Sequence, residues 1–137
     1  MIIIRGYQKA THDDLLKMLK WCQNKFNLRD WSVSLETGEK PDWVDVNVDT
    51  IDGISVVDTN YMFAKIWIPI EKVKEDDRNP FQILAHEVLH VMTIGAGNIS
   101  GQKSEFISYR LDDMIYCLYM GTTNKDIADI KDAMNVC

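Results

Sequence analysis

One helical segment limits what this chain can fold into more than any other feature of its sequence. Residues 81–94 read FQILAHEVLHVMTI, and most of these residues are apolar. Asn79 suits the cap of a helix and Pro80 its first position, while Gly95 suits a position just beyond the last turn. The pattern therefore predicts a helix from Pro80 to about Ile94 that is buried on nearly all sides.

Three ionisable residues interrupt this apolar segment at its middle. His86, Glu87 and His90 form the pattern HExxH, and burying them without partners would cost several kcal/mol. Because His86 and His90 are four residues apart, both imidazoles project from one face of the helix and can reach a single ion. Neutral imidazole is a good ligand for zinc. The spacing thus predicts a zinc site, in preference to a coincidental pair of histidines.

A catalytic zinc ion needs a third protein ligand, and the position of Glu105 favours it for that role. His90 lies five residues before Gly95, roughly 7 Å along its helix, and Glu105 lies four residues after Gly101, roughly 6 Å along the next helix. If the two helices pack as a hairpin, Glu105 returns to the level of His90. The alternative is an ordinary acidic residue in the first turn of a helix.

Glu87, Tyr109 and Asp112 are candidates for the supporting roles. Glu87 is rotated by about 100° from His86, away from the metal, where it could act as general base and acid on a metal-bound water. Tyr109 follows Glu105 by one turn and could donate a hydrogen bond to an oxyanion, although packing is the more usual role of such a tyrosine. Asp112 either accepts the second N–H of a ligating histidine or is solvated.

The remaining sequence predicts a single α+β domain over residues 1–137. It begins with a helix, continues with a small three-stranded sheet, mixed or antiparallel, and ends with two helices that carry the site. Pro69 follows the third strand directly and favours an edge position for that strand. The expected helices are 12–27, 80–94 and 102–120, the expected strands are 31–36, 44–48 and 62–68, and residues 124–137 could add a short helix.

Composition and charge disfavour several functional classes. A formal charge of −6 disfavours nucleic-acid binding, which gains affinity from basic surfaces. No apolar stretch is long enough to span a bilayer, and we recognise no secretion signal. The three cysteines, Cys22, Cys117 and Cys137, are widely spaced without a CxxC pair. They favour reduced thiols in a cytoplasmic protein over a disulfide framework or a thiolate metal site.

With HEVLH on a buried helix, a glycine-containing turn and Glu105 on the next helix, the chain resembles the zincin metallopeptidases. A glutamate in place of a third histidine makes it similar to a minimal gluzincin, and to small metallopeptidase-like proteins of phages and bacteria. The resemblance covers most of the chain in layout, but its specific motif is five residues and one glutamate. Tyr109 stands where many gluzincins have aspartate, and the spacing between His90 and Glu105 is shorter than in the larger members.

The resemblance implies a peptidase that hydrolyses peptide or protein substrates. His86, His90 and Glu105 would bind Zn²⁺, and Glu87 would be the general base and acid. The strand around 63–68 would be the edge strand that holds an extended peptide by main-chain pairing.

Two other functions stay open at this point. The first is a zinc hydrolase that acts on nucleic acid, similar to bacterial rRNA-processing endoribonucleases. Those enzymes carry glycine after the first histidine, where this chain has Glu87, and a third histidine that is absent here. The second is a catalytically inactive zincin-like module with a binding or structural role. Such a module would be expected to lose Glu87 or a ligand first, and all of these residues are present.

Overall fold

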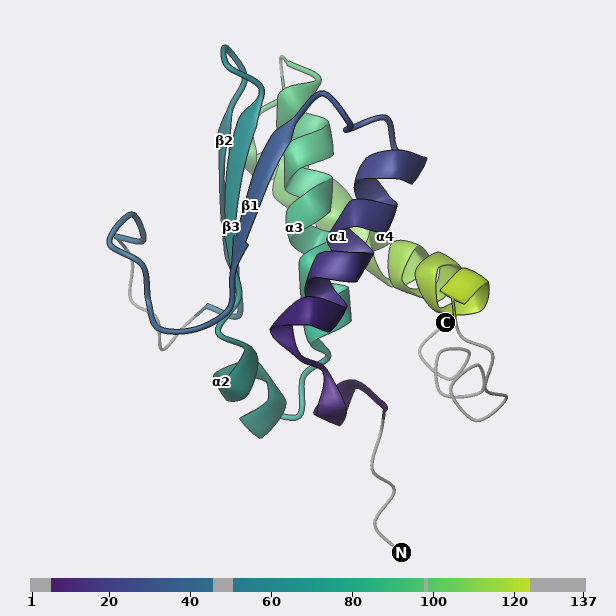
Figure 1. The fold of residues 1–137 in the computed structure, drawn as a ribbon. Coiled ribbons are helices and arrows are strands. Elements are labelled where there is room, and N and C mark those ends of the chain that lie inside the picture. The colour runs from purple at the N-terminus through teal and green to yellow at the C-terminus, as the bar shows by residue number, and fades with distance from the viewer. Residues whose placement is uncertain (1–5, 46–50, 98, 124–137) are drawn as a thin grey trace, which may run out of the picture.

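The computed structural model describes residues 6–45, 51–97 and 99–123, and within these ranges the chain has an α+β fold (Figure 1). The expected order of one helix, a small sheet and two long helices is confirmed, with a short extra helix after the sheet. The residues expected to form a terminal helix, 124–137, lie outside the described ranges. The elements are a 3-10 turn at Gly6–Lys9, α1 at His12–Lys25, β1 at Ser32–Glu36, β2 at Ile54–Asp58, β3 at Phe63–Trp67, α2 at Ile70–Glu75, α3 at Pro80–Gly95 and α4 at Gly101–Thr123.

The sheet is mixed, with β3 between the other two strands. Its order is β1-β3-β2; β1 runs parallel to β3, and β2 runs antiparallel to it. The expectation that residues 63–68 form an edge strand is therefore wrong. Pro69 lies beyond the last residue of β3 and serves as the cap residue of α2, so its missing N–H interrupts no ladder. Within the described residues, β1 and β2 are the edges.

The second strand lies at a different place from the one expected. Of the alternating segment 44–48, Val44 is buried in an irregular turn and residues 46–50 lie outside the described ranges. The strand in the sheet is instead β2, which the turn signals on both sides had concealed. Asp58 ends that strand, and its carboxylate accepts hydrogen bonds from the backbone N–H groups of Asn60 and Tyr61, a local bond that favours a turn.

The helices begin where their capping residues predict. Thr11 and Asp14 form a reciprocal capping box at the start of α1. The Asn79 side chain accepts from the N–H of Phe81 at 3.0 Å, which caps α3 with Pro80 in its first turn. The start of the site-bearing helix α3 is therefore set by local sequence.

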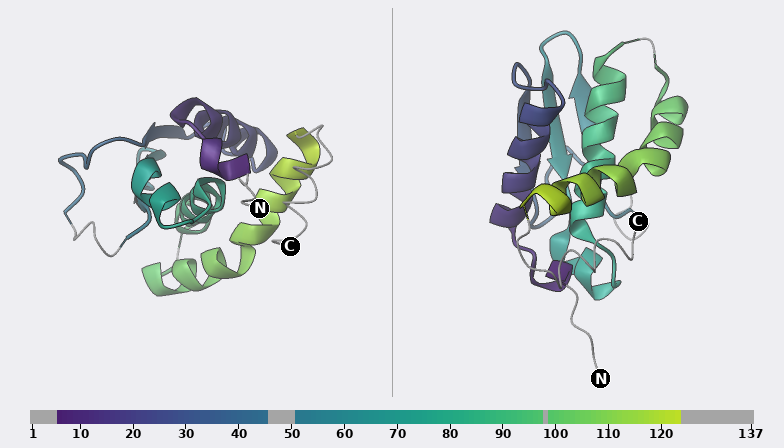
Figure 2. Two further views of the ribbon diagram at one scale, coloured as in Figure 1. Left: turned by 90° about the horizontal axis from the view of Figure 1, so that it is seen from below. Right: turned by 90° about the vertical axis from the view of Figure 1, so that its right-hand side faces the viewer.

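Helix α3 lies at the centre of the molecule. It packs against α1, α4 and β2, and α1 and α3 lie on the same face of the sheet (Figures 1 and 2). Ala64 and Ile66 of β3 belong to one buried cluster with Leu84, Val88 and Val91 of α3. The expected burial of this helix on nearly all sides is confirmed, and it holds the HExxH residues in a packed core.

Two further expectations concern the membrane and the cysteines. In the part of the chain that the structure describes, no helix is both long enough and apolar enough to cross a bilayer. Cys22 is a free thiol and fully buried, whereas Cys117 is disulfide-bonded. The expectation of reduced thiols is therefore right for Cys22 and wrong for Cys117.

Candidate metal centre

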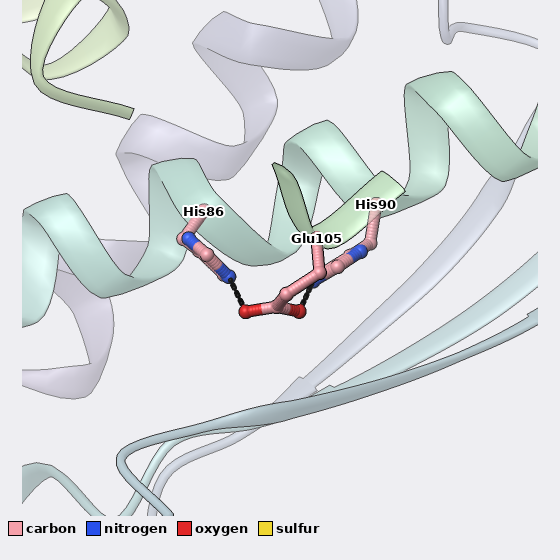
Figure 3. A group of neighbouring side chains, drawn as sticks. All are labelled: His86, His90 and Glu105. Atoms are coloured by element: carbon pink, nitrogen blue, oxygen red, sulfur yellow. Dashed lines mark hydrogen bonds and ion pairs between the residues drawn. The ribbon is translucent and has the colours of Figure 1, made fainter. Parts of the chain in front are cut away.

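Helices α3 and α4 bring together His86, His90 and Glu105, the three residues expected to be ligands (Figure 3). One ligand atom from each lies within 4.8 Å of the other two. Glu105 therefore lies where a helical hairpin would place it, while its role as a metal ligand stays a prediction. The third histidine, His12, contacts Thr37 through its Nδ1 and does not belong to this group.

The Glu105 carboxylate lies between the two imidazoles. Its Oε1 is 2.9 Å from His86 Nε2, and its Oε2 is 2.8 Å from His90 Nε2. Each histidine therefore directs the same ring nitrogen toward the same acidic group. One side of the cluster is half exposed, because Glu105 has a side-chain exposure of 46%, and this leaves access for an ion.

A second polar contact holds each imidazole from behind. Asp112 Oδ2 lies 3.1 Å from His86 Nδ1, and Asp112 also accepts a hydrogen bond from the Gln82 amide at 3.4 Å. Ser104 Oγ lies 2.7 Å from His90 Nδ1. Asp112 is buried, so of its two sequence-based alternatives the structure favours the partner of a histidine. Such contacts orient metal-binding histidines and fix which nitrogen carries the proton.

The donor and acceptor roles around His86 lead to a specific requirement. An ionised Asp112 can only accept, so His86 Nδ1 carries the hydrogen and, in a neutral ring, Nε2 presents a lone pair. That lone pair faces an oxygen of Glu105 at 2.9 Å. Two acceptors at this distance need a positive charge between them, either a proton or a metal ion. Two imidazole nitrogens and one carboxylate are a donor set that Zn²⁺ accepts, with a fourth position left open.

Burial also acts on the charge of His90. Desolvation lowers the pKa of this imidazole below its usual value, while the nearby Glu105 carboxylate acts in the opposite direction. A buried ring that resists protonation is better suited to bind an ion through a lone pair than to carry a charge itself.

Glu87 lies beside the cluster and does not belong to the three-residue group. Its side chain is 5% exposed, and burial raises its pKa from 4.5 to about 7. The Ser55 hydroxyl of β2 donates a hydrogen bond to this carboxylate. Gly53 lies so close that a Cβ at that position would be 3.4 Å from Glu87 Oε2. The start of β2 therefore holds the carboxylate in place.

Ser55 is a site residue that the sequence reasoning missed. In the register of the sheet it pairs with Ile66 of β3, and this pair faces the helices together with Val57 and Ala64. A polar residue among inward-facing apolar ones is a recognisable signal. The signal was hidden because residues 54–58 were not recognised as a strand.

An open cleft of about 540 Å³ connects these groups. It is bounded by α3, α4 and the segment leading into β2. Tyr109 lies on its rim with 68% of its side chain exposed, and its ring centre is 4.6 Å from that of His86. The role of Tyr109 as a hydrogen-bond donor stays a prediction. The cleft is lined by Ile51, Asp52, Gly53, Ile54, Ser55, Arg78, Gln82, Ile83, His86, Glu87, His90, Ile94, Gly101, Glu105, Tyr109, Asp112 and Asp113.

Comparisons with known proteins assign neither a family nor a function to this chain. No protein-family model, no curated protein and no solved structure matches this chain. Its function must therefore be argued from the site.

Proposed function

We propose that this protein is a zinc-dependent hydrolase that cleaves peptide bonds, with the layout of a small zincin of the gluzincin type. The observation that carries the proposal is the convergence of two imidazole nitrogens and one carboxylate, with Asp112 and Ser104 behind the rings. Glu87 lies next to these ligands in the same cleft. Two imidazole nitrogens that face one carboxylate form a ligand set that suits a divalent cation.

His86, His90 and Glu105 would hold the ion, and zinc in such a site supplies a Lewis acid that polarises a carbonyl and lowers the pKa of water. Glu87 accepts the proton of the attacking water and delivers it to the leaving amine. In the metal-free chain, burial raises the pKa of this carboxyl group, which makes its carboxylate a readier proton acceptor. Ser55 keeps this carboxylate oriented toward the cleft.

The substrate would bind along β2, which takes the role first expected for residues 63–68. Among the residues that the structure describes, β2 is an edge of the sheet, and its first residues line the cleft beside Glu87. An unpaired edge strand can hold an extended peptide by main-chain hydrogen bonds. Tyr109, exposed on the opposite rim, would donate to the oxyanion that forms at the scissile carbonyl.

Metal content is the first test of this proposal. We expect about one zinc ion per chain in the purified protein by elemental mass spectrometry. Glu105→Ala and His90→Ala should both lose it, because each removes one of three ligands. Glu105→Gln is a stricter variant, since it keeps the size of the side chain and removes its charge. Wild-type protein that stays folded and binds no added zinc would refute the metal site.

Hydrolysis is the second test, with a library of unstructured peptides as the substrate. Glu87→Gln should retain zinc and lose turnover, because the amide cannot accept the proton. Zinc binding without cleavage of any peptide, by wild type and Glu87→Gln alike, would refute the peptidase and favour the inactive module. Cleavage of RNA that depends on zinc would favour the nucleic-acid hydrolase.

A further inference from the structure

Behind His90, a chain of hydroxyl groups leads from the imidazole to the backbone of α3. His90 Nδ1 is 2.7 Å from Ser104 Oγ, and Ser104 Oγ is 2.6 Å from Thr93 Oγ1. Thr93 Oγ1 donates to the carbonyl oxygen of Leu89 at 2.8 Å. These short contacts link the start of α4 to α3 on the side of the imidazole away from the cleft.

The carbonyl at the end of this chain sets the direction of every hydrogen bond in it. A carbonyl oxygen can only accept, so the Thr93 hydroxyl uses its single hydrogen on Leu89. Thr93 must then accept from Ser104, which uses its own hydrogen there. With that hydrogen committed, Ser104 can only accept from His90. The proton of the neutral imidazole is thereby held on Nδ1.

We propose that Ser104 and Thr93 are positioning residues that prepare His90 for metal binding, by holding its proton on Nδ1 and its Nε2 lone pair toward Glu105. This inference rests on the proposed metal site and extends it. Asp112 performs the same task for His86 with a carboxylate. The two histidines are thus oriented by different chemistry, an acid for one and a chain of neutral hydroxyls for the other.

Burial makes the hydroxyl chain effective. Ser104 is fully buried, with 0% of its surface exposed, so water cannot replace its hydrogen bonds when they are lost. Ser104 also directly precedes Glu105, and one turn of α4 therefore supplies both a ligand and the support of a second ligand. The Leu89 carbonyl belongs to α3 itself, which ties the orientation of the ring to the helix that carries it.

The affinity for Zn²⁺ tests this proposal, measured by competition with a chromophoric chelator. Ser104→Ala should weaken binding by about 10-fold to 100-fold, as loss of a group that orients a ligating histidine does. Ser108→Ala is the matched control. Ser108 is also a fully buried serine of α4, and its hydroxyl has no hydrogen-bond partner among the described residues. Its removal should leave the affinity within about 2-fold.

Substitutions of Thr93 test whether the whole chain of hydroxyls orients His90, or only the contact between Ser104 and His90. Thr93→Val keeps the shape and removes the acceptor of Ser104, so affinity should fall by about 2-fold to 10-fold, the effect of one neutral hydrogen bond. Thr93→Ser keeps the hydroxyl and should retain wild-type affinity. Equal affinities of Ser104→Ala and Ser108→Ala, or of Thr93→Val and Thr93→Ser, would overturn the proposal.

A measurement without metal separates this inference from the proposed function. Nitrogen chemical shifts of the imidazole report which nitrogen carries the proton, and metal-free Glu105→Ala leaves the hydroxyl chain as the dominant partner of His90. We expect the Nδ1–H form in that variant, and a change toward the Nε2–H form when Ser104→Ala is added. Absence of zinc binding would refute the metal site alone. An Nε2–H form of His90 in Glu105→Ala would refute the role of the hydroxyl chain in holding the proton on Nδ1.

Discussion

The ionisation of Glu87 should make the metal-free protein less stable as the pH rises toward neutrality. Burial raises the pKa of this carboxyl group from 4.5 to about 7 in the folded state, while the unfolded chain ionises at the ordinary value. Between these two pH values the folded protein therefore holds a proton that the unfolded chain has released. The folded state binds more protons, so the free energy of unfolding falls with increasing pH.

The size of the effect follows from the two pKa values. At about 1.4 kcal/mol for each pKa unit, the interval from 4.5 to about 7 corresponds to about 3 kcal/mol. This contribution to the free energy of unfolding is fully present below pH 4.5 and is lost once the pH exceeds about 7. Glu87→Gln removes it, because an amide does not titrate and still fits the same space.

Chemical denaturation in the presence of a chelator measures this change. The difference in unfolding free energy between wild type and Glu87→Gln should change by about 3 kcal/mol between pH 4.5 and pH 8, in favour of the variant at the higher pH. Parallel curves for wild type and Glu87→Gln would refute the argument that burial holds the proton.

Three shorter predictions concern other parts of the structure. Ser55→Val should lower peptide turnover by about 10-fold at unchanged zinc content, as loss of a hydrogen bond to a charged group does. Ser55→Thr keeps the hydroxyl and should retain the turnover of wild type. Equal rates for the two variants would contradict the role of this hydroxyl. Gly95→Ala should lower the urea midpoint of unfolding, because the new Cβ would lie 2.7 Å from Trp31 Cζ2. This overpacking costs about 1–3 kcal/mol, which exceeds the gain in helix propensity of about 1 kcal/mol. A raised midpoint would contradict the prediction. Burial raises the pKa of Cys22 to about 12, so this thiol should resist alkylation at pH 8 until the protein is unfolded, as mass spectrometry would show.

Helix geometry explains why the three candidate ligands could be placed together from sequence. His86 and His90 lie on one face by periodicity alone, and a short turn at Gly97 and Gly101 leads into a returning helix at a fixed rise per residue. The position of Glu105 then followed from counting residues along both helices. Apart from the assumption that the two helices pack as a hairpin, every step used local rules, and the structure brings the three side chains together.

The sheet and its contribution to the site were harder to predict. Which strand is central depends on pairing between distant segments, and Pro69 gave a misleading signal because it starts a helix instead of ending an edge strand. The alternation in 44–48 matched a strand better than residues 54–58, where Val56 and Val57 are consecutive apolar residues. The contact between Ser55 and Glu87 could not be found while β2 itself was missed.

The separation of nineteen residues between His86 and Glu105 has an evolutionary consequence. The atoms that would hold the ion come from two consecutive helices, whereas Ser55, which contacts Glu87, and the neighbouring residues that line the cleft come from an earlier strand and the segment before it. If the proposed function is correct, mutations in β2 would change the choice of substrate and leave the candidate metal ligands untouched. Close relatives with the same helical pair could act on quite different targets.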